Sequence, residues 1–249
     1  MKRLFILSVI GLAINGCSKK IDGTGIRDEK CKIVSIKKSM PEVYTIFNFS
    51  YDAQGKISTV AYIRYDSIQK MPLEIESTYS YHTSSIVANV SYKNKDELSH
   101  EDTYTLDKRN LIISDSQGRK FEYDSEGKLI KITSRWGSYS IFSYKDGNLV
   151  SQQDYDEDGK PNTLLTDSFE YDYTNEYIPY SMIYGVHYLD PRTETVLYEQ
   201  GFFGKRSKNR IKSYNTTEIS YTLEPSQIKK LSSVSPSGFL FMDYYWSCK

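Results

Sequence analysis

The feature that most constrains the fold is a short motif that recurs along the chain. Its clearest copy is FEYDSEGKLIKI, residues 121–132, in which Phe121 and Tyr123 share one face of a strand and Gly127 precedes the return strand. A glycine at this place, where the backbone takes a positive φ, is typical of a three-residue hairpin loop with a G1 bulge. Residues 121–132 are therefore predicted to form a β-hairpin.

Further copies of the motif lie on both sides of this hairpin. FSYDAQGKISTV spans residues 49–60, FSYKDGNLV spans 142–150, and YDEDGK at 155–160 copies the turn alone. Two weaker copies, YTLDKRNLI and YTLEPSQIKKL, begin at Tyr104 and Tyr221 and lack the turn glycine. Turn residues recur about every 8 to 12 positions through the middle of the chain, which indicates a meander of short strands and not βαβ units.

One segment departs from the strand pattern. Residues 190–194 place an acid, a proline and an early glutamate in the order of a helix N-terminus, and Gly201 stands where a helix would end. We predict one short helix near residues 191–200. The predicted fold class is thus all-β: an antiparallel meander of hairpins, curled towards an open or closed barrel, with this short helix.

The start of the chain has the pattern of an export signal. Lys2 and Arg3 precede an apolar run that is too short to span a bilayer as a permanent helix. The sequence INGC at residues 14–17 resembles the bacterial lipobox, in which the signal is removed before the cysteine and the thiol becomes diacylglyceryl-modified. The resemblance implies that residues 1–16 are a lipoprotein signal peptide and that Cys17 is the lipidation site. An ordinary secretory peptide with an incidental cysteine is the alternative.

A tether and a single domain are expected after the signal. Residues 17–30 hold the lipidated Cys17 and a polar stretch, and residues 31–249 carry hairpin patterns without a Pro/Ser-rich linker, which predicts one β-meander domain. More than one acyl chain holds a soluble domain on a membrane. In lipoproteins that resemble this one, acidic residues right after the cysteine mark transport to the cell surface, whereas here Ser-Lys-Lys follows it. We therefore expect lipid anchoring to the outer membrane in the cell envelope, on its periplasmic face and not on the cell surface.

Two further cysteines lie at the two ends of the predicted domain. Cys31 and Cys248 belong to a compartment in which disulfides form. A bond between them closes a loop of about 216 residues and, on chain-entropy reasoning, stabilises the fold by about 4 to 5 kcal/mol. The alternative is a pair of buried or unpaired thiols.

The charge balance argues against one class of partner. The 32 Lys and Arg residues equal the 32 Asp and Glu residues, and removal of the signal, with Lys2 and Arg3, leaves a net charge of about −2. An exported chain without a basic stripe lacks the signature of nucleic-acid binding. The local basic run KRSKNR at 205–210 is interpreted as a solvated loop, with a contact site as the alternative. The expected partners are the membrane, through the N-terminal lipid anchor, and an envelope protein or a glycan.

Few residues stand out as candidates for chemistry. Asp154, Asp156 and Asp158 match the D-x-D-x-D-G opening of a calcium loop, but Leu165 stands where the bidentate glutamate belongs, so a plain hairpin turn is favoured. Most aspartates fall at turns, where they usually accept backbone hydrogen bonds. The three histidines lack metal-site spacing, and neither a G-x-S-x-G elbow nor a P-loop motif occurs. No catalytic residue, resident metal or cofactor is assigned.

The high aromatic content is the remaining feature that could indicate a binding function. The chain has 23 Tyr and 10 Phe residues, which suits a thin β structure in which Tyr covers apolar neighbours and keeps its hydroxyl wet. Trp136 and Trp246 are the candidates for a platform that binds sugar rings or a partner's side chains. Cross-strand pairing of tyrosines, which holds the sheet together, is the favoured alternative.

The Tyr-Asp hairpins resemble YD-type repeats. With Cys31, the segment 204–209 and the C-terminal WSC at 246–248, they make the chain similar to a family of Bacteroidetes-type lipoproteins of unknown function with a porin-like fold. The resemblance implies a long antiparallel meander curled towards a barrel, and no known activity. A membrane-spanning barrel is not expected, because the strands are about six to nine residues long and their outer positions carry charged and polar side chains in place of an apolar band.

The predicted function is a non-enzymatic binding or envelope-structural role for a membrane-anchored lipoprotein. The alternatives are a glycan-binding accessory module and a hydrolase that acts on polysaccharide through carboxylates the sequence does not single out. A deep cleft with two converging acids about 5 to 10 Å apart would favour the hydrolase.

Overall fold

The computed structural model describes most of the chain from residue 31 onwards. The described residues are 31–40, 42–67, 71–176, 189–190, 193–215, 217–224, 230–234 and 241–248. The predicted signal peptide and the tether, with Cys17, lie outside them.

The described residues form seventeen strands, one α-helix and one short 3-10 helix. In chain order these are β1 (Cys31–Met40), β2 (Val43–Tyr51), β3 (Ile57–Asp66), β4 (Leu73–Tyr81), β5 (Ser85–Tyr92), η1 (Asp96–Leu98), β6 (His100–Leu106), β7 (Ile112–Asp115), β8 (Lys120–Tyr123), β9 (Leu129–Thr133), β10 (Tyr139–Lys145), β11 (Asn148–Tyr155), β12 (Pro161–Glu176), α1 (Glu194–Glu199), β13 (Asn209–Tyr214), β14 (Thr217–Glu218), β15 (Ser220–Glu224), β16 (Lys230–Val234) and β17 (Phe241–Cys248).

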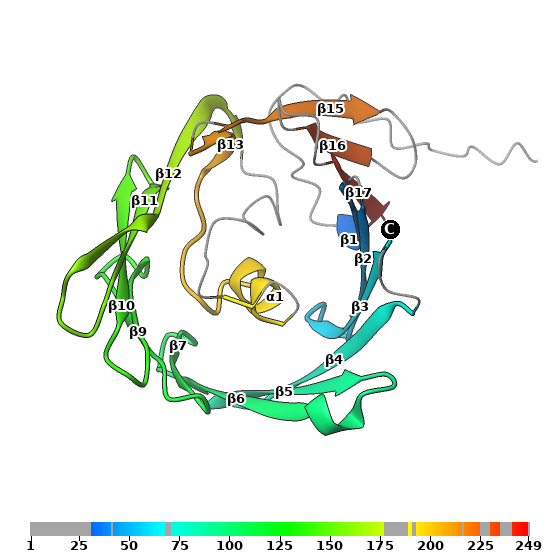
Figure 1. The fold of residues 1–249 in the computed structure, drawn as a ribbon, viewed down its shortest axis with the longest axis horizontal. Coiled ribbons are helices and arrows are strands. Elements are labelled where there is room, and N and C mark those ends of the chain that lie inside the picture. The colour runs from blue at the N-terminus through cyan, green and yellow to red at the C-terminus, as the bar shows by residue number, and fades with distance from the viewer. Residues whose placement is uncertain are drawn as a thin grey trace, which may run out of the picture.

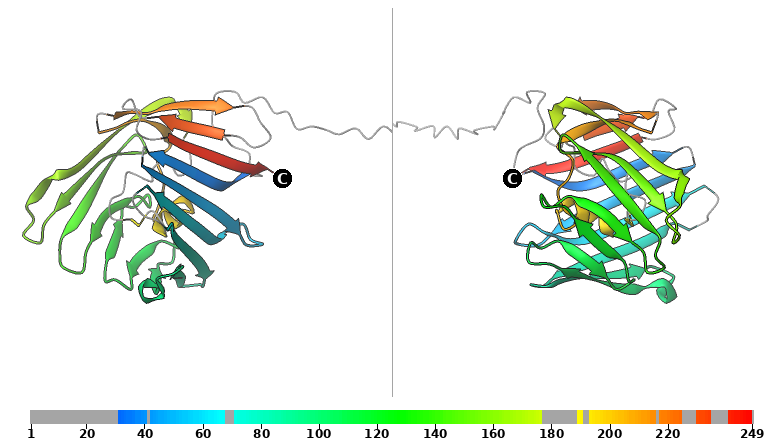
Figure 2. Two further views of the ribbon diagram at one scale, coloured as in Figure 1. Left: turned by 45° about the vertical axis from the view of Figure 1, so that its right-hand side comes forward. Right: turned by 90° about the vertical axis from the view of Figure 1, so that its left-hand side faces the viewer.

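The strands pair antiparallel with their neighbours in the chain. β1 to β14 form one run in which each strand pairs with the next. β15 to β17 form a second run, and β17 joins it to β1. The sheet curls round on itself (Figure 1), with its strands crossing the wall obliquely (Figure 2), and no ladder among the described residues joins β14 to β15. The predicted all-β meander curled towards a barrel is confirmed, and the sheet is open.

The hairpin at residues 121–132 has the predicted conformation. Phe121 pairs with Ile132, and a bulge shifts the register before the turn. Gly127 has a φ of 82°, its N–H donates to the Asp124 carbonyl over 3.1 Å, and the Asp124 carboxylate accepts the Lys128 N–H over 2.8 Å. The turns that begin at Asp52, Asp107, Asp115 and Asp156 repeat this carboxylate bond to the backbone four residues on. At Asp107 the glycine is replaced by Asn110, which takes a φ of 61°, because Asn tolerates the left-handed region.

Side chains alternate across the wall, as the period of a strand requires. In β4, Ile75, Ser77 and Tyr79 are buried while Glu76, Thr78 and Ser80 are exposed. The buried side chains of the described strands, with those of α1 and the residues after it, form the core inside the curl (Figure 1). The fully buried large side chains are Tyr104, Tyr244, Phe203, Ile36, Ile57, Ile86, Ile112, Ile132, Leu149, Leu197 and Ile211.

Much of the tyrosine surplus has a structural explanation. Tyrosines near strand ends donate their hydroxyls to carbonyls on an earlier strand over 2.7 to 2.9 Å; the pairs are Tyr51 to Ile33, Tyr81 to Ile57, Tyr123 to Ile112, Tyr171 to Leu149 and Tyr221 to Ile211. Burial raises the pKa of Tyr81 and of Tyr171 to about 12. These hydroxyls therefore stay protonated and act as fixed donors that tie strands together, which is a more specific role than the expected pairing of rings.

The short helix is confirmed within the predicted range. α1 runs from Glu194 to Glu199, and all six of its residues are buried; residues 191–192 lie outside the described part of the chain. Gly201 ends the helix with a φ of 85°, while the Phe202 N–H bonds back to the Leu197 carbonyl over 2.9 Å, a Schellman termination. The helix lies inside the curled sheet (Figure 1). It fills the interior, which the hydrophobic pattern alone did not predict.

One end of the sheet carries the helix connection. Because the strands alternate in direction, every second connection lies at the same end of the sheet. These connections are the turns β2–β3, β4–β5, β6–β7, β8–β9 and β10–β11 and the β12–β13 connection that holds α1. We call this the plug end, and we call residues 189–208, as far as they are described, the plug. Cys31 and Cys248 are opposite each other in the β1–β17 register, and they lie at the plug end too.

Gly204 sets how closely the plug approaches the wall, and its replacement is our first prediction. A Cβ at Gly204, whose φ is 91°, would lie 2.5 Å from the Gly127 carbonyl oxygen, whereas a Cβ at Gly201, whose φ is 85°, meets no atom within 4 Å. Gly204→Ala is therefore expected to cost about 2 to 3 kcal/mol of unfolding free energy and Gly201→Ala about 1 kcal/mol, the cost of the left-handed backbone alone. Urea denaturation of the two variants measures the difference. Equal losses would show that the contact with Gly127 carries no steric constraint.

Candidate functional site

The plug is fastened to the inside of the wall by backbone and aromatic contacts. The Ile112 N–H donates to the Phe202 carbonyl over 2.9 Å, and the Tyr79 hydroxyl donates to the Thr193 carbonyl over 2.8 Å. The buried Phe203 ring meets the Tyr104 and Phe121 rings edge-on, at centroid distances of 6.3 and 5.2 Å. The phenylalanines after the helix therefore dock the plug on the strands.

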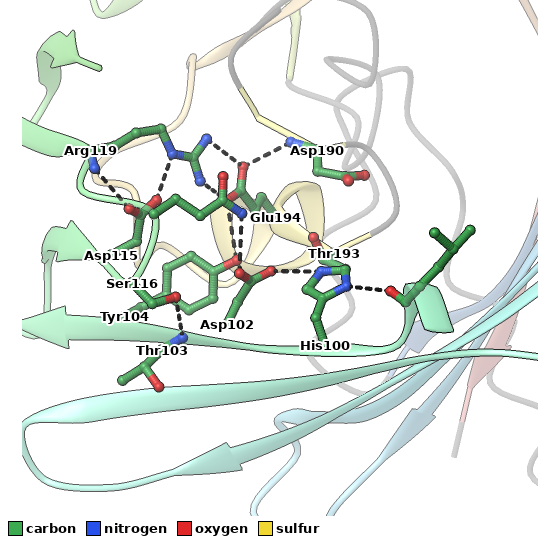
Figure 3. Close-up of polar contacts among 12 residues, drawn as sticks. His100, Asp102, Thr103, Tyr104, Asp115, Ser116, Arg119, Asp190, Thr193 and Glu194 are labelled. Carbon is green, nitrogen blue, oxygen red and sulfur yellow. Dashed lines mark hydrogen bonds and ion pairs between the residues drawn. The ribbon is translucent and has the colours of Figure 1, made fainter. Parts of the chain in front are cut away.

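A buried ionic cluster adds a polar link between the plug and the wall (Figure 3). Arg119, in the β7–β8 turn, donates to Asp115 over 2.5 Å through Nε and to Glu194 of α1 over 3.2 Å through Nη1, and its Nη2 also contacts Glu194. The Tyr104 hydroxyl and the Asp190 N–H donate to the same carboxylate over 3.1 and 2.8 Å. The Glu194 and Asp115 side chains are only 2% and 1% exposed. Both charges are thus held by one guanidinium inside the protein.

The electrostatics of this cluster reflect its burial. Burial raises the pKa of Glu194, and the neighbouring Arg119 opposes that rise. Burial disfavours the charge on Arg119, but Glu194 and Asp115 together raise the pKa of the guanidinium above its ordinary value. Burial also raises the pKa of Tyr104, so its hydroxyl serves as a donor. The cluster is suited to fixing the plug in place.

A second polar group continues from this cluster along β6. His100 Nε2 lies 3.4 Å from Asp102 Oδ2 (Figure 3). The Gln117 amide donates to Asp102 Oδ1 over 3.1 Å. Within the described ranges, no group of three or more His, Cys, Asp or Glu side chains is arranged to hold a metal ion. Neither cavity described below is lined by Asp102, Asp115 or Glu194.

The main opening lies at the plug end. It is a cavity of about 930 Å³, which we call the cup, and it is lined by the β6–β7 and β8–β9 turns, the residues that follow α1, and the ends of β12 and β13. Its lining residues are Arg109, Leu111, Ser125, Glu126, Gly127, Glu176, Gly201, Gly204, Lys205, Arg206, Ser207, Lys208 and Asn209. Four of them are cations and two are carboxylates, so the lining carries a net positive charge.

The four cations of the cup differ in how far they are neutralised. Arg109 Nε lies 3.0 Å from Asp107, and Arg206 Nη1 lies 3.0 Å from Glu199. Lys205 and Lys208 are exposed and have no carboxylate partner within 4 Å among the described residues. Their charge is therefore available to a ligand.

A smaller cavity of about 340 Å³ adjoins the cup and shares Arg109 and Gly201 with it. The Tyr81 and Phe202 rings stack there at a centroid distance of 5.7 Å, with Lys56 Nζ 4.7 Å from the Tyr81 ring centre. We call this the side cavity. Lys56, directly before β3, thus adds a further cation next to those of the cup.

The structure separates the three aspartates of the candidate calcium loop. Asp154 is buried in β11 and accepts hydrogen bonds from Ser140 over 2.7 Å and from Gln152 over 3.2 Å. Asp156 accepts the Lys160 N–H over 2.7 Å as the turn aspartate, and Asp158 is exposed, 3.5 Å from the Lys160 ammonium. Each carboxylate has its own structural partner, so the plain hairpin turn accounts for this segment.

The two tryptophans have different environments. Trp136 is 69% exposed in the β9–β10 turn, where the Arg135 guanidinium lies 4.0 Å from its ring centre. Trp246 is only 4% exposed and packs in the core. The two side chains do not form a common surface, and a binding role for Trp136 stays a prediction.

The basic run at residues 205–210, predicted to be a solvated loop, is largely exposed. Lys205, Arg206 and Lys208 are exposed and precede β13, which begins at Asn209. Residues 205–208 also line the cup, and a ligand contact at this run stays a prediction. Arg109 and Lys56 join the same region from distant turns, and no local pattern could have grouped them with Lys205.

Comparisons with known proteins support the fold alone. No protein-family model matches the chain, and no curated protein does. A porin-like protein from Bacteroides uniformis is similar in structure, with a TM-score of 0.56 and 18% sequence identity over 87% of this chain and 96% of that chain. A porin-like protein from Bacteroides vulgatus gives a TM-score of 0.34 and 11% identity, over 85% of this chain and 97% of that chain. The first likeness shows that the curled sheet is porin-like.

The comparison supports the porin-like fold that the resemblance implied. It does not test lipid anchoring. Across the described residues, the structure holds no helix with the length and apolar character needed to cross a membrane.

Proposed function

We propose that this chain is a lipid-anchored protein of the bacterial envelope whose curled sheet presents a ligand-binding cup, without catalysis. The observation that supports the binding role is an open cavity beside a filled interior. All six residues of α1 are buried, and a concave space of about 930 Å³ remains at the plug end beside the residues that follow α1. A concave site of this size suits a small molecule or the end of a polymer.

The anchoring part of the proposal rests on the sequence around Cys17. INGC at residues 14–17 resembles a lipobox, and thirteen residues separate Cys17 from the first strand. Fully extended, a chain of that length reaches about 45 Å. Since Cys31 begins β1 at the plug end, the tether reaches the domain on the side of the cup.

A glycan-binding accessory role is the second candidate, and the size and openness of the cup favour it. The hydrolase alternative has less support. Glu126, a carboxylate of the cup, forms an ion pair with Lys128 over 2.7 Å, and that contact lowers the pKa of Glu126. A general acid for glycoside cleavage needs a raised pKa. The buried acids Glu194 and Asp115 are held by Arg119 and do not line the cup.

Lipid attachment gives the second testable prediction. Cells that express the full chain in the presence of an alkyne analogue of palmitate are expected to incorporate the label into this protein, and Cys17→Ser is expected to abolish labelling and to release the protein from the membrane fraction. Ser18→Ala is the matched control, because it alters the neighbouring position and retains the acylated thiol. Labelling that persists in Cys17→Ser would refute the anchor.

A further inference from the structure

We propose that the cup binds a ligand that carries two or more anionic groups, with Lys205 and Lys208 as its principal contacts. The anionic groups are phosphate, sulfate or carboxylate, all of which accept charge-assisted hydrogen bonds from ammonium and guanidinium groups. The inference deepens the proposed binding role and rests on it, but it does not depend on lipid attachment at Cys17.

Positive charge exceeds negative charge in the cup. Among the cup residues, Arg109 and Arg206 each have a carboxylate within 3.0 Å, and Glu126 is paired with Lys128. Lys205 and Lys208 lie in the same short segment and form no ion pair within 4 Å in the described part of the chain, although the Lys205 charge also helps to lower the pKa of Glu126. Clefts lined by one sign of charge concentrate ligands of the opposite sign.

Hydrogen bonds to the backbone hold this segment in place. The Lys205 N–H donates to the Gly127 carbonyl over 2.8 Å. The buried Asn148 side chain accepts the N–H groups of Lys208 and Asn209 over 2.8 and 2.9 Å and donates to the Asn209 side chain over 3.0 Å. A segment that is ordered before binding loses less entropy when the ligand arrives. The backbone that carries the two lysines is therefore held in place by hydrogen bonds before a ligand arrives.

The packing of Lys208 supports the same conclusion. A Cβ added at Gly147 would lie 2.7 Å from the Lys208 Cδ and Cε atoms, so the aliphatic part of Lys208 runs across the β10–β11 turn. The stem is thus supported by the backbone while the side chain stays exposed. Gly147 leaves the space that this packing needs.

The size of the cup and the positions of its cations favour an extended ligand. The cup is much larger than one phosphate group, and it continues through Arg109 into the side cavity beside Lys56. A line of cations of this kind matches an extended anion and not a single ion. Two sources share this chemistry: a soluble acidic oligomer, and the head groups of anionic lipids, which are relevant because Cys31 places the tether at the same end.

The third testable prediction compares anionic and neutral probes on the chain from residue 17 onwards, carrying Cys17→Ser so that it is made without lipid. Calorimetry at about 100 mM salt uses tripolyphosphate and a heparin-derived tetrasaccharide as anions and maltotetraose as the neutral oligomer. Vesicles of phosphatidylglycerol with phosphatidylcholine, against phosphatidylcholine alone, supply the lipid arm. We expect binding of the soluble anions, of the anionic vesicles, or of both, and binding that weakens as salt rises. Whichever arm binds identifies the source.

Substitutions distinguish a specific binding site in the cup from a general attraction of anions to positive charge. Lys205→Gln with Lys208→Gln is expected to weaken anion binding by about tenfold or more, while Lys205→Arg with Lys208→Arg retains it. Lys120→Gln with Lys160→Gln removes the same charge from exposed positions at the opposite end and is expected to leave the affinity unchanged. The proposal is overturned if no anionic probe binds, if maltotetraose binds as tightly as the anions, or if the control pair weakens binding as much as the cup pair.

Discussion

Arg119→Met is expected to lower the free energy of unfolding by about 3 to 5 kcal/mol, the usual cost of removing one partner from a buried ion pair. The guanidinium is the shared counter-ion of Asp115 and Glu194, whose side chains are 1% and 2% exposed. Methionine fills a similar volume but leaves two carboxylates close together without their cation. Chemical denaturation with two spectroscopic probes measures the change.

Two further variants test whether burial is the cause of this loss. Lys93→Met removes the cation of an exposed pair with Glu74, whose side chains are 66% and 30% exposed, and is expected to cost no more than about 1 kcal/mol. Adding Glu194→Gln to Arg119→Met is expected to recover part of the loss, because one unpaired charge is then absent. If Arg119→Met costs no more than Lys93→Met, the cluster does not fasten the plug.

The same variant has a characteristic pH dependence. Burial raises the pKa of Glu194 above its ordinary value of 4.5, and loss of Arg119 removes the main opposing influence. A group whose pKa is higher in the folded state binds more protons when folded, so its contribution is favourable below the unfolded pKa and is lost as the pH rises through the folded pKa. Arg119→Met should therefore regain stability relative to the wild type as the pH is lowered from 7 towards about 5. A constant difference across this range would contradict the assignment.

Reduction of a disulfide between Cys31 and Cys248 is expected to lower the free energy of unfolding by about 4 to 5 kcal/mol. The two residues are direct partners in the β1–β17 ladder, and opposed residues of antiparallel strands have Cα atoms about 4.5 to 5.5 Å apart, within the range that a disulfide bridges. The bond would fasten the first strand to the last one, where no short turn connects them.

Alkylation of the unfolded, unreduced protein from the cell envelope tests the bond directly. No label is expected on Cys31 or Cys248 before reduction, and one label on each after it. The double variant Cys31→Ser with Cys248→Ser is the control, because its stability should not respond to the reductant. Two labelled cysteines before reduction would end the disulfide proposal.

The hairpins were predictable because their determinants are local. A turn glycine with a positive φ, an aspartate that bonds to the backbone four residues on, and alternating apolar residues all act within about ten residues of one another. The termination of α1 at Gly201 is local in the same sense. The turn at Asp115, with Gly118, repeats the pattern, although the sequence interpretation did not single it out.

The plug and the cup could not be predicted in this way. The Arg119–Glu194 contact joins residues 75 positions apart, and the contact between Gly127 and Lys205 depends on α1 lying inside the sheet. The helix was predicted from a local pattern, and that pattern does not say which face of the sheet the helix meets. The basic run at 205–210 was predicted to be solvated, but its place beside Gly127 depends on the same arrangement.

An antiparallel meander with one short helix follows from the sequence alone, because turn chemistry and side-chain alternation act over a few residues and do not depend on the rest of the fold. The sequence also predicts lipid attachment at Cys17. The three-dimensional fold was needed to show that the sheet curls round α1 (Figure 1), that Cys31 and Cys248 are opposite each other in the β1–β17 register, and that Lys205 and Lys208 line a cavity. These relations depend on the accumulated curvature of many paired strands, which brings distant residues together and leaves no trace in any single stretch of the chain.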